Sequence, residues 1–150
     1  MRHLLLLLTI GLVLTSCATV KTGSFKAKTE QVQNSKSKLD NYVAANEWMV
    51  EKFNSAEDVI QFADKEAGIV KGKYTLNYAA PVYYGYGYST PARLSTAIIT
   101  IRVKDSVAKI ELKATNVNYV ANKGHNIPTL DVYAAKLRAL MEDFKNYMND

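Results

Sequence analysis

The sequence has few of the residues from which metal sites and disulfides are built. Its 150 residues include one cysteine, Cys17, and two histidines, His3 and His125. A single cysteine excludes a disulfide within the chain, so packing alone must stabilise the fold. A zinc site takes four protein ligands, or three and a water, and this chain cannot supply them from its histidines. We therefore predict that the protein binds no metal and needs no cofactor.

Sequence signatures of catalysis are also absent. The chain contains neither the Gly-x-Gly-x-x-Gly pattern nor a P-loop, and it has no Gly-x-Ser-x-Gly nucleophile elbow. The nearest carboxylate pair, Asp64 and Glu66, has Lys65 between its members in a turn-forming segment, which is typical of solvated turn residues rather than of a tuned acid and base. We predict a protein that is not an enzyme.

What the sequence does contain begins with a short apolar leader. Arg2 precedes an apolar run over residues 4–14, and small residues lead into Cys17. A spanning helix needs about 20 apolar residues, so this run is too short to be one. The segment resembles a bacterial lipoprotein signal peptide with its lipobox. The resemblance implies that residues 1–16 are removed and that Cys17 is acylated, which would attach the protein to a membrane.

The residues after the cysteine bear on the destination. Ala18 stands where the signal for retention in the inner membrane has aspartate, and no acidic cluster of the surface-export type follows. We expect an outer-membrane lipoprotein of the bacterial cell envelope whose domain faces the periplasm. The alternative is a secretory peptide cut elsewhere, which would leave a free thiol outside the cytoplasm.

Net charge limits the kinds of partner. Without its leader the chain has 18 basic and 14 acidic residues, a net charge of +4. This mild excess suits anionic surfaces but falls short of the dense basic stripe of a nucleic-acid-binding protein. We predict that nucleic acid is not a partner.

Two helices are predicted, after a polar segment. Residues 17–36 are rich in Lys, Thr, Ser, Gln and Asn, which predicts a flexible tether, although Phe25 could begin an edge strand. An [ST]-x-x-[DE] capping pattern at Ser37 starts the first helix. Its apolar positions are Leu39, Tyr42, Val43, Asn46, Met49 and Phe53, with Trp48 beside them. The second helix follows Pro128, and its apolar positions are Leu130, Tyr133, Ala134, Leu137, Leu140, Met141, Phe144 and Met148.

Between the helices the apolar pattern changes to a period of two. Alternation runs from residue 59 to 78, with a turn at 64–68, and from 96 to 115, with a turn at 104–106. Val70, Tyr74, Leu76 and Tyr78 are expected on one face of the first hairpin. The opposite face is polar, as antiparallel sheets allow. The predicted fold is an α+β two-layer sandwich over 37–150, with two helices on one face of a four-stranded antiparallel sheet, or a five-stranded one.

Several segments together resemble a known family. They are Ala44 to Phe53 with its Glu-Trp pair, Asp64 to Lys73 with its Asp-Lys-Glu turn, and Ile99 to Asp105. This set is similar to the bacterial domain of unknown function DUF4468, over about residues 39–119. The resemblance implies a TBP-like fold exported in envelope proteins, often lipoproteins, with no assigned catalytic residues. The family pattern has a glycine-containing turn where this chain has Ser106.

Two glycines in these segments have a structural role of their own. Gly68 is expected to supply a positive φ after a tight turn. Gly72 is expected to allow a bulge or the close approach of a helix.

Two features suggest recognition. The first is a loop between Pro81 and Pro91, in which tyrosines alternate with glycines, a combination that suits peptide or sugar binding. Its tyrosines are Tyr83, Tyr84, Tyr86 and Tyr88. The second is the polar sheet face, where six basic residues are opposed only by Glu111. These cations are Lys71, Lys73, Arg102, Lys104, Lys109 and Lys113.

Three roles are compatible with these features. We favour a noncatalytic module, anchored to a membrane through Cys17, that binds an envelope protein or a glycan. An enzyme acting on envelope polymers, a hydrolase or transferase using Tyr86, Asp64 or His125, is the alternative. A third role is that of a structural spacer, with a polar face that is merely solvated.

Overall fold

The computed structural model describes residues 20–53, 59–84, 88–120 and 127–150, and for residues 83, 84, 88 and 89 it describes the backbone alone. Cys17, Tyr86 and His125 therefore lie outside the described residues. In chain order the elements are β1 (Lys21–Gly23), β2 (Lys28–Gln33), α2 (Lys38–Phe53), β3 (Ile60–Asp64), β4 (Ile69–Ala79), β5 (Val82–Tyr84), β6 (Tyr88–Thr90), β7 (Arg93–Lys104), β8 (Val107–Thr115), β9 (Val117–Tyr119) and α4 (Leu130–Asn149).

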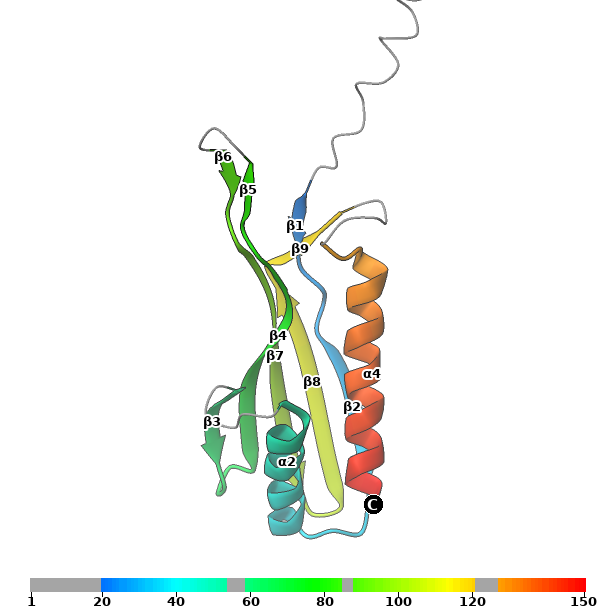
Figure 1. The fold of residues 1–150 in the computed structure, drawn as a ribbon. Coiled ribbons are helices and arrows are strands. Elements are labelled where there is room, and N and C mark those ends of the chain that lie inside the picture. Colours follow the sequence, from blue (N-terminus) through cyan, green and yellow to red (C-terminus); the bar gives the residue numbers. More distant parts are fainter. Residues whose placement is uncertain (1–19, 54–58, 85–87, 121–126) are drawn as a thin grey trace, which may run out of the picture.

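The main sheet has five antiparallel strands in the order β2-β8-β7-β4-β3. Both helices lie on one side of this sheet, with α4 running along β2 and β8 and the shorter α2 beside it (Figure 1). The two predicted hairpins are β3–β4 and β7–β8. The predicted α+β two-layer sandwich is therefore confirmed, with the fifth strand present.

The fifth strand corrects the predicted tether at 17–36. Strand β2 pairs with β8 along its whole length, and β1 pairs with β9. Val32 is buried, and the amide of Phe25 donates to the carbonyl of Ala114 at 3.0 Å. The segment looked too polar to order itself, but an edge strand needs only a few inward side chains because its backbone bonds to a neighbour that is already in place.

The core lies between the sheet and the helices. The predicted inward residues of β7 and β8 are all buried, and so is the predicted stripe of α4 from Tyr133 to Met148 except Ala134. The stripe of α2 is partly different from the prediction, because Leu39 and Val43 are 47% and 45% exposed. Asn41 and Ala45 are buried in their place. This helix has two candidate faces for burial, and only its contact with the sheet determines which one is buried.

Polar contacts explain why an asparagine is buried at the start of α2. Asn41 Nδ2 donates to the carbonyl of Lys104 at 3.0 Å, and its Oδ1 accepts from Asn34 Nδ2 at 2.8 Å. Asn34 Nδ2 also donates to the carbonyl of Met148 at 3.2 Å, near the end of α4. Each buried polar atom of this cluster therefore has a partner, as burial requires. The cluster joins β2, α2, β7 and α4 at one end of the molecule.

The turns at this end confirm the predicted helix cap at Ser37, the predicted positive φ of Gly68 and the predicted turn at 104–106. Ser37 Oγ accepts from the amide of Asp40 at 3.2 Å, as the capping pattern predicts, and the amide of Lys38 donates to Asp105 Oδ1 at 2.7 Å. Gly68 has φ +66°, and a Cβ there would lie 2.6 Å from the carbonyl oxygen of Val103. The β7–β8 turn uses no glycine: Ser106 itself adopts φ 60°.

Candidate binding surface on the open sheet face

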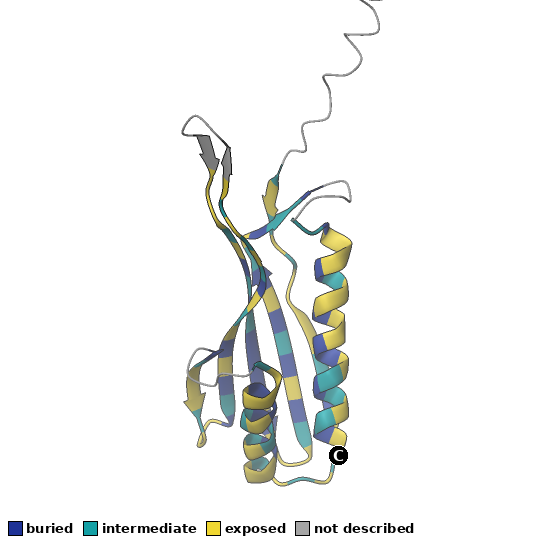
Figure 2. Cartoon of the chain, in the orientation of Figure 1, coloured by how far each residue is buried: buried dark blue, intermediate teal, exposed yellow. Residues whose placement is uncertain are grey.

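The two faces of the sheet differ in their covering. Along β7 and β8 each buried residue alternates with an exposed or half-buried one, apart from the buried Thr100, which Figure 2 shows as bands of colour across the strands. The buried members point toward α2 and α4. The other members form the opposite face, here called the open face, on which no helix of the described part of the chain packs. Strand alternation thus gives one sheet a dry side and a wet side.

All six predicted cations lie on the open face. Strand register puts Lys71 and Glu111 on either side of Thr100, and Lys73 and Lys113 on either side of Ile98. Each of the six residues is exposed; they are Lys71, Lys73, Arg102, Lys104, Lys109 and Lys113. The structure therefore brings together, on three adjacent strands, residues that span more than forty positions of the sequence. Their role in binding stays a prediction.

Glu111 neutralises little of the charge of this face. Glu111 Oε2 lies 3.9 Å from Arg102 Nη1, and both side chains are substantially exposed. A pair this long and this wet contributes little. Arg102 also lies directly across from Lys109 in the register, where like charges repel. The face keeps an unfavourable pair without a structural gain that we can identify.

Uncharged groups complete the open face. Lys71 Nζ lies 5.9 Å from the centre of the Phe62 ring, within the range of a cation–π contact. Ile69, Ile98 and Val107 are half-buried between the charged side chains. The open face is therefore a mixed surface, with apolar area among its cations.

The tyrosine loop projects from the main sheet. Strands β5 and β6 pair with each other alone, with Tyr84 opposite Tyr88, and they continue the β4–β7 pair into a two-stranded ribbon (Figure 1). The side chains of Tyr83, Tyr84 and Tyr88, and all of Tyr86, lie outside the described residues. Recognition by these four tyrosines stays a prediction.

A β-bulge at the base of this ribbon overturns the expected orientation of Tyr78. Thr75 pairs with Thr96 and Asn77 with Ser95, so Leu76 is the extra residue. The bulge shifts the alternation, and Tyr78 is 61% exposed rather than inward. The sequence pattern missed this because alternation cannot register an inserted residue until the partner strand is known.

Lys136 of α4 satisfies the carbonyl that the bulge leaves free. Its Nζ donates to the backbone oxygen of Leu76 at 2.9 Å. This long basic side chain on the helix surface thus has a structural role.

The residues of the alternative, enzymatic role do not converge in the part of the chain that the structure describes. Asp64 Oδ1 accepts from the amide of Ala67 at 2.8 Å, which fixes the β3–β4 turn. No cluster of three or more His, Cys, Asp or Glu side chains is found among the described residues. His125 and Tyr86 lie outside them.

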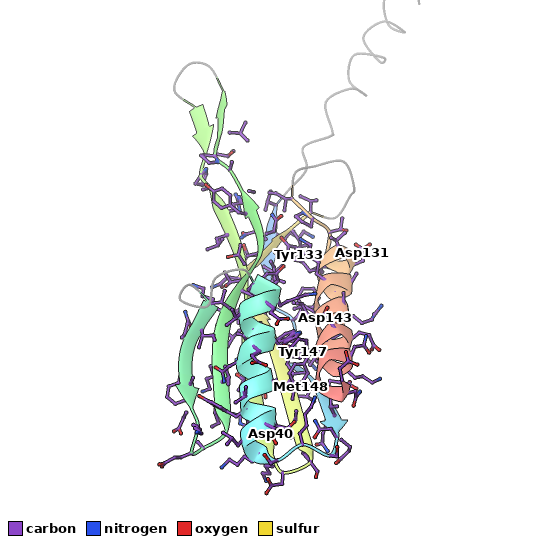
Figure 3. The ribbon with its side chains drawn as sticks, turned by 60° about the horizontal axis from the view of Figure 1, so that its bottom comes forward. Asp40, Asp131, Tyr133, Asp143, Tyr147 and Met148 are labelled. Atoms are coloured by element: carbon purple, nitrogen blue, oxygen red, sulfur yellow. The ribbon has the colours of Figure 1, made fainter. Side chains whose placement is uncertain are left out.

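Three groups with shifted pKa values lie on α4 instead, and two of them, Asp143 and Tyr133, form contacts between elements. Burial alone would raise the pKa of Asp143, but its bonds outweigh this effect and hold the pKa below its ordinary value. Lys52 Nζ donates to Asp143 Oδ1 at 2.6 Å and Trp48 Nε1 to Oδ2 at 2.7 Å. Asp143 is labelled in Figure 3, where it lies on the side of α4 toward α2. Both donors come from α2 and the acceptor from α4. This arrangement joins the helices and shows no sign of chemistry.

Tyr133 forms the second such contact. Its buried hydroxyl lies 2.9 Å from the carbonyl of Asn118 and 3.1 Å from Ser95 Oγ, and Ser95 Oγ accepts from the amide of Asn118 at 3.0 Å. Burial raises the pKa of Tyr133, and the hydrogen bond with Ser95 offsets part of the rise. The contact fastens the start of α4 to β7 and β9, so it is structural as well.

Comparison with known proteins gives the fold. No family model and no curated protein matches the sequence. A DUF4468 family protein from Bacteroides ovatus ATCC 8483 is 17% identical, with 80% of each chain covered and a TM-score of 0.46. A TBP-like protein from Parabacteroides distasonis ATCC 8503 is 15% identical, with 89% of this chain and 97% of that chain covered and a TM-score of 0.53. The structural neighbours thus include both kinds of protein that the sequence resembles, and the second likeness confirms the TBP-like fold.

Among the described residues, no helix is both long and apolar enough to cross a bilayer.

Proposed function

We propose that this protein is a noncatalytic binding module of the bacterial envelope, attached to the outer membrane through a lipid on Cys17, and that its open face binds an acidic envelope protein or an anionic glycan. One observation supports the binding proposal above all. Six exposed cations share the open face, and the half-buried Glu111 pairs only weakly with one of them.

The physical argument starts from the two faces of the sheet. A surface that only had to stay soluble would mix charges of both signs, since mixed charges avoid repulsion between neighbours. The open face instead places Arg102 opposite Lys109. Such concentrated charge speeds the encounter with an acidic partner and selects against basic ones. The half-buried Ile98 at its centre adds apolar contact once the partner is docked.

The leader supports attachment to the envelope. Its charged start, short apolar run and small residues before Cys17 fit a lipoprotein signal peptide. Two or three acyl chains suffice for stable attachment where one chain is marginal. Export of this kind also removes the chain from the chromosome, so the TBP-like fold carries no suggestion of DNA binding.

The experiment is photo-crosslinking in living cells. A photoreactive amino acid replaces Thr75, an exposed residue of β4 whose register partner is Thr96 on the open face. We expect one recurrent acidic protein, or one anionic glycan, to be captured. A spacer with a merely solvated face would give no recurrent species, and that result would contradict the proposal.

A matched probe tests the location of the binding surface. Arg138 lies on the exposed side of α4, in the layer that covers the opposite face of the sheet. The same probe at Arg138 is expected to capture nothing that recurs. Equal capture from both positions would mean that the contacts are not specific to the open face.

A further inference from the structure

Apolar side chains at the base of the ribbon and along it are substantially exposed in the described part of the protein. Tyr78 and Leu94 face each other across its base and are 61% and 47% exposed, and Val82 further along is 41% exposed. A lone two-stranded ribbon has little stability of its own. Apolar exposure on such an element is a cost unless another surface covers it.

The start of the folded chain lies at this same end of the molecule. Thr22 of β1 pairs with Asn118 of β9, and Asn118 Nδ2 donates to the carbonyl of Leu94 at 3.2 Å. Thr22 is thus level with the base of the ribbon. Both β1 and the ribbon extend away from the end that carries the C-terminus (Figure 1).

Chain lengths then relate the lipid anchor to the ribbon. Four residues lie between Cys17 and Thr22, and the five Cα–Cα steps span at most about 17 Å even when fully extended. The ribbon rises by six residues from Tyr78 to Tyr84, which is about 20 Å at the usual strand spacing. A lipid on Cys17 would therefore keep Thr22, and with it the base of the ribbon, within about 17 Å of the lipid surface. Because the ribbon extends about 20 Å beyond that level, an anchor at this end would bring the ribbon close to the lipid surface.

We propose that the β5–β6 ribbon is a membrane-contacting element, which rests on the lipid headgroups and orients the anchored domain with its long axis away from the bilayer. The inference depends on the lipid anchor of the proposed function. The bilayer is thus the surface that covers the exposed apolar side chains, because the short chain to Cys17 would keep them close to the lipid.

The chemistry of this end suits a headgroup layer. Tyrosine is favoured at the boundary between lipid and water, since its ring is apolar and its hydroxyl polar. Tyr78 is exposed at the ribbon base, and by sequence β5 and β6 are rich in tyrosine. The exposed Lys21 of β1 and the half-exposed Arg93 of β7 supply positive charge at the same end for lipid phosphates.

This orientation gives the open face a defined place. The strands run along the long axis of the molecule. A protein held by its ribbon end would therefore have its sheet perpendicular to the membrane plane, with the open face turned to the side. The open face would then remain free for a partner in the periplasm instead of lying flat on the lipid.

The test uses the full chain, lipidated in cells, purified and reconstituted into vesicles of phosphatidylethanolamine and phosphatidylglycerol. The only natural cysteine is Cys17, whose sulfur is blocked by the lipid, so one new cysteine can be labelled alone. Val82→Cys puts a fluorophore on the ribbon. Phe62→Cys is the matched control, because Phe62 is 48% exposed but lies on β3, away from the ribbon.

The readout is quenching by a quencher carried on the lipids. We expect the label at position 82 to be quenched at least threefold more strongly than the label at position 62. A label from Leu94→Cys, at the ribbon base, should fall between the two. Equal quenching at 82 and 62 in protein that floats with the vesicles would overturn the proposed orientation while leaving the anchor intact.

Flotation separates the two proposals. If the purified protein does not float with the vesicles, the anchor itself is wrong, and the orientation that rests on it falls as well. If it floats, and Cys17→Ser abolishes flotation, the quenching result judges the ribbon alone.

Discussion

The covered face and the open face of the sheet come from the same strands, yet they are specified by different physics. On the covered face most contacts are set by shape: Gly72 has no side chain because Met49 and the backbone of Val59 already occupy the space. On the open face the residues touch few neighbours and are set by charge. Packing therefore determines whether the protein folds, and the open face is free to determine what it binds.

The largest expected effect comes from breaking the covered face. In Gly72→Ala the new Cβ would lie 2.2 Å from Met49 Cε and 2.7 Å from the carbonyl oxygen of Val59. Overpacking of this kind should lower the free energy of unfolding by about 2 kcal/mol, measured by urea denaturation. Lys73→Ala, one residue along and pointing the other way, should change it by no more than about 0.5 kcal/mol. Similar losses for both variants would erase the contrast between the faces.

A smaller effect is expected where the two helices of the cover meet. Asp143→Asn keeps the shape of the side chain but removes the charge that Lys52 and Trp48 bind. We expect a loss of about 1 kcal/mol at neutral pH, since the site is partly exposed.

The loss at Asp143 should depend on pH. The folded pKa of Asp143 lies below its ordinary value of 3.8, so its contribution to stability is full above that pH and is lost as the pH falls through the folded pKa. Unfolding curves of the parent protein and Asp143→Asn should therefore converge in acid. A difference that stays constant from pH 7 to the acid end would show that charge is not what the site uses.

The smallest stability effect has the opposite sign. Lys109→Glu replaces the like charge that faces Arg102 with an opposite one. The free energy of unfolding should rise by about 0.5 kcal/mol, the usual scale of a cross-strand pair. Capture by the Thr75 probe should fall at the same time, because the face loses two units of positive charge. A variant that is more stable and binds as well as before would mean that the repulsion serves no partner.

Much of the fold can be predicted from the sequence because these elements depend on local sequence patterns. Alternation over 96–115 predicts the β7–β8 hairpin and its buried side, and the capping pattern at Ser37 predicts the start of α2. Gly68 and Gly72 have the backbone roles expected of them. Each of these signals is complete within a few residues, so no knowledge of the partner strand is needed.

The failures share the opposite property. Strand β2 has one deeply buried residue, Val32, and its pairing with β8 supplies the rest of its order. The bulge at Leu76 exists only relative to β7, and it turns Tyr78 outward. The choice between the two stripes of α2 was likewise made by the sheet. Sequence patterns cannot contain information that arises when distant segments meet.

The candidate site divides in the same way. The six cations could be assigned to one face because strand period alone decides it. Their closeness across three strands needed the register, and so did the repulsion between Arg102 and Lys109. The ribbon's place beside the start of the folded chain could not be predicted, because residues 17–36 were expected to be a tether.

The most direct test of the central claim reverses the charge of the open face and reads binding and stability together. Lys71, Lys73, Arg102 and Lys104 are changed to glutamate in the protein that carries the Thr75 probe. A matched variant changes four exposed or half-exposed cations outside that face, and these are Lys26, Lys65, Arg138 and Lys145. We predict that crosslinking falls at least about tenfold in the first variant alone, with both variants folded. Unchanged crosslinking in the first variant, or an equal loss in both, would contradict the claim that the open face binds the partner.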